Sequence, residues 1–469
     1  ESDGLYMVGK GKVYSLTSRQ DERQLIAMGS YIVIMPDKKY YNTVDSSDRG
    51  NIENSYSTSE QDVQSTTFSL CKYDGDKLTY TTSSTAPASP KDGAYWLDTS
   101  GTPHVLRVYS GNQDMWNAVA TTYIKIQAKN IAKLFATDDA VYFTGLPSEL
   151  SEYNNASSII YKRYRNNKAG IEGSKDYIVI KGIIDQTITI NTTVTVSRRM
   201  PDMDFIIESG NRLWGCRYGT NRDGEFVNEI YASKLGDFKN WESFAGTSAD
   251  SYTASCGTNG NWSGAISFGG YPHFFKEDYM HKVYGNVPSN YQIQSVACAG
   301  VVYGGGKSLA VVNDTLFYKS RNGICAYNGS LPQEISTIFG DKSYNAKLFY
   351  EGTGVPNPLV NGATAGSYGN KYYLCVRENT ENDETRPGRT LILVYDTNLG
   401  LWHIQESGAI HSFCRCSDDL YFVNGLSEIC KMDASRKNVF GVGQEEENKN
   451  VEWYVESGIL GTSVSDGNS

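Results

Sequence analysis

The residues SLAVVNDTLFYKSRNGICAYNG, 308–329, show the pattern that recurs along the chain most clearly. Its short apolar runs are separated first by Asn313-Asp314 and then by a polar break that contains a glycine. A two-residue Asn-Asp turn between apolar runs is typical of a β-hairpin. We therefore expect antiparallel strands that follow one another directly along the chain.

The same pattern recurs at intervals that are typical of a propeller blade. Comparable aromatic residues that follow a turn, Phe274, Phe317, Tyr372 and Tyr421, are spaced 43, 55 and 49 residues apart. Repeats of about 40 to 50 residues built from short antiparallel strands predict a β-propeller. We expect an all-β fold with a degenerate six- or seven-bladed propeller. The segments that carry the pattern are 25–42, 264–285, 308–329, 364–404 and 410–433, with a looser version in 209–236.

The composition agrees with a β fold. The 469 residues include 34 Tyr, 16 Phe, 7 Trp and 46 Gly but only 12 Pro, and helical periodicity is almost absent. Tyrosine suits strands that are exposed on one side, because its ring packs while its hydroxyl stays in water. No apolar run approaches the roughly 18 residues of a membrane helix, so no membrane insertion is expected. The start without Met favours a processed chain or a fragment.

The repeat is interrupted between about 69 and 200. Residues 81–90, TTSSTAPASP, read as a linker, and residues 94–119 read as a compact β module that contains Trp96 and Trp116. The alternating, β-branched stretch 177–196 predicts a second unit of barrel or sandwich type. We expect propeller strands in 1–68, inserted β modules in 69–200 and the remaining blades in 201–469.

The sequence argues against two ligand classes, nucleotides and tightly bound nucleic acids. GGGKS at 304–308 resembles a phosphate-binding loop, but Val301 stands where a glycine is needed and strands follow instead of a helix. The net charge is −10 with no basic block. That balance argues against tight nucleic-acid binding, which depends on neutralised phosphates.

No catalytic residue, metal ligand or cofactor is predicted, and we expect no enzyme. Ser233, Gly236, Asp237 and Trp241 partly match the Asp-box turns of sialidase-type propellers, where such residues brace a hairpin. A sialidase also needs an arginine cluster, which Arg198, Arg199, Arg212, Arg217 and Arg222 can supply only if they share one pocket. Most of the nine cysteines lie in apolar runs and are expected as buried thiols. Trp96 and Trp116 either stack on sugars or form the core of their module, and the core reading is favoured.

Residues 198–244 resemble a signature of tailed-bacteriophage tail and neck structural proteins, of the packaged-DNA stabilisation and tail-nozzle type. The signature has an N-R-L-W strand, then an I-Y-x-S strand followed by G-D-x-x-N-W. The matching positions here are Arg212, Leu213, Trp214, Ile230, Tyr231, Ser233, Gly236, Asp237, Asn240 and Trp241. Shorter likenesses occur at 31–43 and 451–461.

The resemblance implies a structural protein of the virion, located in the tail or neck and assembled in the bacterial host cytoplasm. Such proteins form oligomeric rings around the DNA path, which retain the packaged viral genome and guide its ejection. The implied partners are copies of the chain itself, expected as a hexamer, and other tail or portal-adaptor proteins. DNA would pass through without sequence-specific binding. Arg212, Trp214, Tyr231, Ser233, Asp237 and Trp241 are expected to brace the hairpin. The alternative is a glycan-binding or glycan-cleaving propeller at a tail tip or cell surface.

Overall fold

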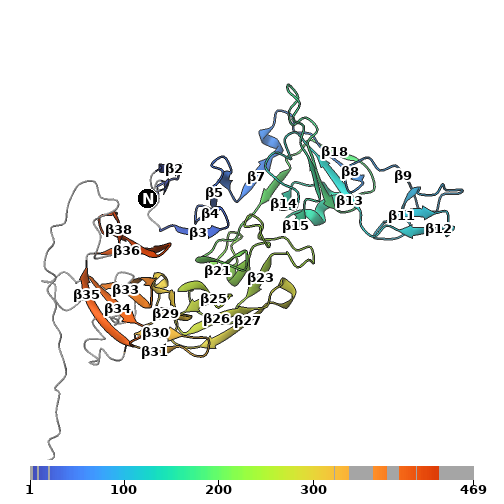
Figure 1. Ribbon diagram of the computed structural model, residues 1–469. Helices are drawn as coiled ribbons and strands as arrows, with labels where there is room; N and C mark the ends of the chain where they lie inside the picture. Colours follow the sequence, from blue (N-terminus) through green and yellow to red (C-terminus); the bar gives the residue numbers. More distant parts are fainter. Residues whose placement is uncertain are drawn as a thin grey trace, which may run out of the picture.

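The protein is all-β. The computed structural model describes residues 4–7, 10–18, 22–321, 323–336, 363–377, 390–407 and 409–432, and these form many small sheets (Figure 1). Helical structure in this part is limited to short 3₁₀ turns, none of which is long enough to cross a membrane. They are η1 (Thr58–Glu60), η2 (Ser148–Tyr153), η3 (Pro288–Asn290) and η4 (Gly306–Ser308).

Five four-stranded antiparallel sheets and one three-stranded sheet account for the repeated pattern. In each, the strands lie in the order in which they occur in the chain. The first two sheets are β3 (Gln24–Met28), β4 (Tyr31–Met35), β5 (Lys39–Asn42) and β6 (Arg49–Asn51), then β20 (Phe205–Ser209), β21 (Arg212–Thr220), β22 (Phe226–Ala232) and β23 (Tyr252–Ser255). The next two are β24 (Gly264–Phe268), β25 (Tyr271–Lys276), β26 (Tyr279–Tyr284) and β27 (Gln292–Ala297), then β28 (Ala310–Val312), β29 (Thr315–Lys319), β30 (Ile324–Tyr327) and β31 (Gln333–Glu334). The last two are β32 (Ala363–Tyr368), β33 (Lys371–Arg377), β34 (Thr390–Asp396) and β35 (Leu401–Ser407), then β36 (Ile410–Cys416), β37 (Asp419–Asn424) and β38 (Ile429–Lys431).

The turns between strands follow the local sequence. Asn313 and Asp314 both have positive φ, 45° and 60°, as a two-residue hairpin turn of type I′ requires. The four aromatic residues that set the expected spacing, Phe274, Phe317, Tyr372 and Tyr421, all lie on the second strand of their sheets. Gly306 to Ser308 form one 3₁₀ turn that leads into β28, so the expected absence of a phosphate-binding helix is confirmed.

These sheets stack face to face in chain order. Each consecutive pair shares a buried apolar cluster, for example the one that joins Trp214 and Ile230 of one sheet to Phe274 and Val283 of the next. Their first strands also contact one another in sequence, β3 with β20, β20 with β24, β28 with β32 and β32 with β36. Such small sheets cannot bury both faces alone and gain a core only by stacking. The sheets therefore follow one another as the blades of a propeller do, along the curve seen in Figure 1.

The beginning of the chain covers the first of these sheets. The hairpin β1 (Gly4–Met7) and β2 (Gly11–Ser15) packs Leu5 and nearby residues against Ile34 and Tyr41. Lys307 of η4 links distant parts of the chain. Its Nζ lies 2.8 Å from Oε1 of Glu22, just before β3, and donates at 3.4 Å to the carbonyl of His411 in β36. Lys307 thus connects the segment just before the first of the stacked sheets with the last of them.

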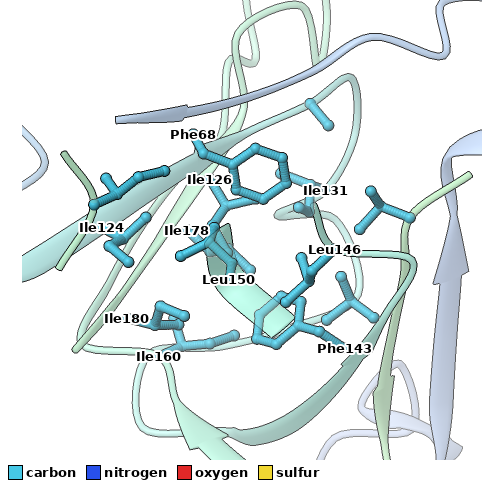
Figure 2. Packing of buried hydrophobic residues seen from close by; sticks show 14 of the residues in the cluster. Phe68, Ile124, Ile126, Ile131, Phe143, Leu146, Leu150, Ile160, Ile178 and Ile180 are labelled. Atoms are coloured by element: carbon cyan, nitrogen blue, oxygen red, sulfur yellow. The ribbon is translucent and has the colours of Figure 1, made fainter. Parts of the chain in front are cut away.

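An inserted unit interrupts the stack after β6. Its first sheet has the order β15 (Ser157–Ile159), β14 (Ala140–Thr144), β19 (Thr195–Arg198), β7 (Asn54–Ser57), and its second has the order β16 (Lys162–Tyr164), β17 (Tyr177–Lys181), β13 (Tyr123–Gln127), β8 (Thr66–Cys71), β18 (Ile188–Ile190). One core fills the space between the sheets, with Phe68, Ile126, Phe143 and Ile178 fully buried (Figure 2). By strand pairing the unit begins at β7, because β7 pairs with β19, so the expected boundary at 69 is too late.

A smaller sheet extends from this unit (Figure 1). It has the order β12 (Met115–Ala118), β11 (Val105–Ser110), β10 (Tyr95–Asp98), β9 (Tyr80–Ser83), and its β9–β10 pair is parallel. Leu97 and Leu106 belong to the same buried cluster as the core of the inserted unit. The first residues of the expected linker, 81–90, belong to β9, which ends at Ser83.

Candidate functional site

The hairpin β21–β22 and the loop that follows it carry the residues singled out by the resemblance. Arg212 opens β21 and is 1% exposed. Its guanidinium donates to the carbonyl oxygens of Ser233 and Ser248, each at 2.8 Å, and also to the carbonyl of Asp250. A planar fork of donors suits several acceptors at once. Arg212 thereby ties the end of β22 to the far end of the loop.

Ser233 and Trp214 hold the two strands together at this point. The hydroxyl of Ser233 is buried and accepts a hydrogen bond from the backbone N–H of Leu213 at 3.0 Å. The indole N–H of Trp214 donates to the carbonyl of Ser209 at 3.1 Å, and its ring packs edge-on to Tyr291, just before β27 of the next sheet. Trp214 therefore joins its own hairpin to its neighbour in the stack.

The loop after β22 is closed by Asp237, Asn240 and Trp241. The carboxylate of Asp237 accepts from the backbone N–H of Lys239 at 3.0 Å and from the side-chain amide of Asn240 at 2.6 Å. Trp241 is 1% exposed and donates from its indole N–H to the carbonyl of Phe238 at 2.8 Å. Short carboxylate-to-backbone bonds of this kind form tight turns. These contacts are the ones that a structural brace needs.

The loop also binds the inserted unit. Asn240 accepts from the backbone N–H of Ala140 at 2.9 Å and donates to the carboxylate of Asp139 at 3.2 Å. Arg198 lies 2.7 Å from the same carboxylate, and both side chains of this ion pair are 5% exposed. A buried polar network holds its partners firmly only when its members are satisfied. Asn240, Asp139 and Arg198 form a polar junction between the propeller-like stack and the inserted unit.

A second part of this junction surrounds Glu242. Burial raises the pKa of its carboxyl group, whereas Tyr142 and Arg199 beside it act to lower it. Within the described part of the chain, its Oε2 is buried without a hydrogen-bond partner. The guanidinium carbon of Arg199 lies 4.3 Å from the ring centre of Tyr142, a cation–π contact. The backbone carbonyl of Glu242 accepts from the hydroxyl of Ser157 at 2.7 Å, which adds another link to the inserted unit.

The arginines that a sialidase would need are each engaged by groups of the chain itself. Arg198 pairs with Asp139 and Arg212 binds backbone carbonyls, as described above. Arg217 lies 2.8 Å from Asp204, and Arg222 pairs with Glu53. Arg199 makes a cation–π contact with Tyr142, and its guanidinium lies 4.0 Å from the carboxylate of Asp223. Each guanidinium is thus committed to a partner within the chain, where a substrate carboxylate would have to compete.

The remaining predicted residues are Tyr231 and the two tryptophans of the small sheet. Tyr231 is buried and donates from its hydroxyl to Glu229 at 2.7 Å. Trp96 is 6% exposed and donates from its indole N–H to the carbonyl of Ser83 at 2.9 Å. Trp116 is partly exposed and packs edge-on to Trp96, with ring centres 5.4 Å apart. The structure brings the pair together as packing residues.

The burial of the cysteines agrees only in part with the expectation. Cys71, Cys216, Cys256, Cys325 and Cys375 are buried free thiols, but Cys414 and Cys416 are exposed. These two lie two residues apart on β36 and so project on the same side of the strand. Among the described residues, no three His, Cys, Asp or Glu side chains are grouped closely enough to hold a metal ion.

Sequence reasoning missed the inserted unit's half of the junction. Asp139 and Tyr142 lie in a segment, 136–144, that carries no motif, and nothing local distinguishes Asp139 from a turn aspartate. Asn240 matched the phage-like signature but was not singled out as a site. A cleft of about 650 Å³ beside β4 and β6 was also missed; it is lined by Thr17, Ser18, Pro36, Asp37, Lys38, Lys39, Asn51 and Glu53.

Comparisons with known proteins give partial structural likenesses. No protein-family model matches the chain, and no curated protein matches it. Hsv2 of Kluyveromyces lactis is similar at 16% identity over 49% of this chain and 60% of that one, with a TM-score of 0.27. A structure described as a putative 6-phosphogluconolactonase from Bacteroides uniformis is similar at 10% identity over 72% and 90%, with a TM-score of 0.31. BamB of Moraxella catarrhalis is similar at 10% identity over 72% and 81%, with a TM-score of 0.25. At such values these likenesses say nothing of what this protein does.

Proposed function

We propose that this protein is a structural component of a bacteriophage tail or neck, and that copies of it form a ring around the DNA path. The proposal rests on the structural role of residues 212–241. The positions that match the phage-like signature are built into the brace and the polar junction, where Arg212, Asn240 and Trp241 are each 1% exposed. Side chains that are buried and bound to the backbone stabilise the fold, and a structural role of this kind is what the resemblance implies.

We also infer that the stacked sheets close into a six-bladed propeller. Lys307 already joins Glu22 before β3 to His411 in β36. If the stack closes there, the hairpin β1–β2, which covers the outer face of the first sheet, lies beside the three-stranded sheet β36–β38. The two together make a composite last blade. A density map of the isolated protein tests this, and seven separate sheets or an open arc would refute it.

In the proposed ring the mechanism is steric and electrostatic. Symmetric copies close an interface around a central path. A chain with a net charge of −10 repels phosphates on balance, which lets DNA slide without sticking. The proposal therefore requires weak binding of double-stranded DNA despite its close passage.

Two measurements test the virion assignment. Mass spectrometry of purified phage particles that encode this chain is expected to find it in the virion, at several copies per particle. Native mass spectrometry of the isolated protein is expected to show a closed oligomer, with a hexamer as the expected size. Absence from particles, or a monomer at the concentrations reached in assembly, would refute the ring.

The glycan-cleaving alternative has less support from the geometry. Its arginines are committed to Asp139, Glu53, Asp204 and backbone carbonyls. A turnover assay with sialylated oligosaccharides distinguishes the two proposals, because the ring predicts no hydrolysis. Measurable turnover would favour the alternative.

A further inference from the structure

The five-stranded sheet of the inserted unit presents a face that the proposed ring does not use. Strand alternation directs Ile124 and Ile126 of β13, and Ile178 and Ile180 of β17, into the core (Figure 2). The alternate positions of the same strands therefore project to the other side of the sheet. On β13 these are Tyr123, Lys125 and Gln127, and on β17 they are Tyr177, Lys181 and Val179, of which Val179 is buried. On the neighbouring edge strand β16 they are Lys162 and Tyr164.

The segment that contains β16 and β17 is positively charged, although the chain as a whole is negative. Residues 161–181 contain six basic side chains against two acidic ones, although the whole protein carries −10. Lys162, Arg165, Lys168 and Lys181 are exposed. Arg163 is committed elsewhere, since it donates to the carbonyls of Ala132 and Phe135 at 3.0 and 2.8 Å. A local cluster of cations in an acidic protein attracts anionic ligands to that place.

Tyrosine rings are interleaved with these cations. Tyr73, Tyr123 and Tyr161 form a cluster of edge-to-face contacts, with ring centres 5.5, 5.6 and 6.5 Å apart. The ammonium of Lys181 lies 5.1 Å from the ring centre of Tyr161. Tyr164 stacks on Tyr177 at 5.3 Å. Tyr73 and Tyr164 are the most open of these rings, with 55% and 47% of their surface exposed.

One edge of the face is less cationic. The turn that contains Asp74 and Asp76 crosses the sheet there, and Lys125 donates to the carbonyl of Gly75 at 2.8 Å. The hydroxyl of Tyr177 donates to the carbonyl of Asp74 at 3.1 Å. These contacts occupy Lys125 and Tyr177, which leaves the remaining residues to bind a ligand. We define the Tyr–Lys face as Tyr73, Tyr123, Tyr161, Lys162, Tyr164 and Lys181.

We propose that the Tyr–Lys face binds a carboxylated polysaccharide. Ammonium groups pair with carboxylates, and tyrosine offers both an apolar ring and a hydroxyl to a sugar. Single-stranded nucleic acid fits less well, because base stacking needs flat open ring faces. Here Tyr164 stacks its face on Tyr177, and Tyr73 and Tyr161 pack edge to face with Tyr123, so neighbouring tyrosines already occupy part of these ring faces. The inference concerns the inserted unit and does not depend on ring formation.

Titration of the full chain with polysaccharides tests the proposal. Polygalacturonate, hyaluronate and polysialic acid serve as carboxylated probes, with dextran as the neutral one and a single-stranded oligonucleotide as the competing polyanion. We expect at least one carboxylated probe to bind, to weaken as salt is raised, and to bind more tightly than dextran or the oligonucleotide. No binding of any carboxylated probe, or tighter binding of the oligonucleotide, would overturn the proposal.

Matched variants locate the site. Lys162→Ala with Lys181→Ala is expected to weaken binding at least about fivefold, since each ion pair at a surface contributes a modest free energy. Tyr164→Ala is expected to weaken it further, whereas Lys91→Ala with Lys133→Ala removes the same charge from exposed positions outside the face. Equal loss in both lysine pairs would show that binding follows net charge alone. Unchanged thermal unfolding of each variant shows that the sheet is intact.

Discussion

Replacing Arg212 by methionine is expected to destabilise the protein strongly. Methionine keeps an unbranched apolar stem but has no guanidinium, so the carbonyls of Ser233, Ser248 and Asp250 lose their donor. Ser233 and Asp250 are buried, whereas Ser248 is exposed and water can replace the lost bond there. An unsatisfied buried carbonyl costs about 1–3 kcal/mol, and bonds to charged groups contribute about 1.5–3 kcal/mol. With two buried carbonyls affected, we expect a loss of about 3–5 kcal/mol.

Denaturant-induced unfolding, followed by the fluorescence of the buried Trp214 and Trp241, measures the effect. Arg222→Met is the matched control, because Arg222 is 43% exposed and its pair with Glu53 lies at the surface. Such a pair contributes no more than about 1 kcal/mol. Arg212→Lys is expected to recover only part of the loss, since an ammonium cannot reproduce the planar fork. If Arg212→Met cost no more than Arg222→Met, the guanidinium would not hold the loop as described.

Three further predictions follow from the same contacts. Asn240→Ala leaves the buried N–H of Ala140 without its acceptor and is expected to cost about 1–3 kcal/mol. Limited proteolysis is expected to release the inserted unit sooner in Asn240→Ala than in the exposed control Asn117→Ala, and equal rates would argue against the junction. Burial lowers the pKa of His273 and of His281 to about 4. Because the unfolded state binds these protons first, each neutral imidazole contributes stability that is complete above pH 6.5 and is lost as pH falls toward 4, by up to about 3 kcal/mol. The pH dependence of unfolding is therefore expected to flatten in His281→Gln, and an unchanged slope would refute that assignment. Thiol titration of the native protein is expected to modify Cys414 and Cys416 first, and burial, which raises the pKa of Cys256 to about 11, keeps that thiol slow. Fast reaction that persists in Cys414→Ser with Cys416→Ser would show that another thiol is open.

The hairpins were predictable because their information is local. Asn313-Asp314 takes the backbone conformation that a two-residue turn needs, and the aromatic residues that follow the turns lie on second strands as their spacing implied. The inserted unit was recognised by the break in the repeat. Its beginning was misplaced, because β7 has no feature of its own that separates it from a propeller strand and is assigned only by pairing with β19.

Some site residues could likewise be predicted from local sequence, and others could not. Arg212, Trp214, Ser233, Asp237 and Trp241 stand close together in sequence, and the contacts among them follow from one hairpin and its loop. Most of the nine cysteines were expected to be buried thiols, yet the positions of Cys414 and Cys416 on β36 leave these two exposed. Burial of a strand residue depends on which sheet lies next to it, and that neighbour is set by stacking.

By itself, the amino-acid sequence determined the short strands, their turns and the all-β character, since alternation and turn residues act within a few positions of the chain. Only the tertiary structure decided that Asp139 meets Arg198 and Asn240, which lie 59 and 101 residues away from it. It also decided that the Tyr–Lys face combines β13, β16 and β17. Contacts over such separations arise when sheets pack against one another, and no local pattern states which polar side chains will then meet.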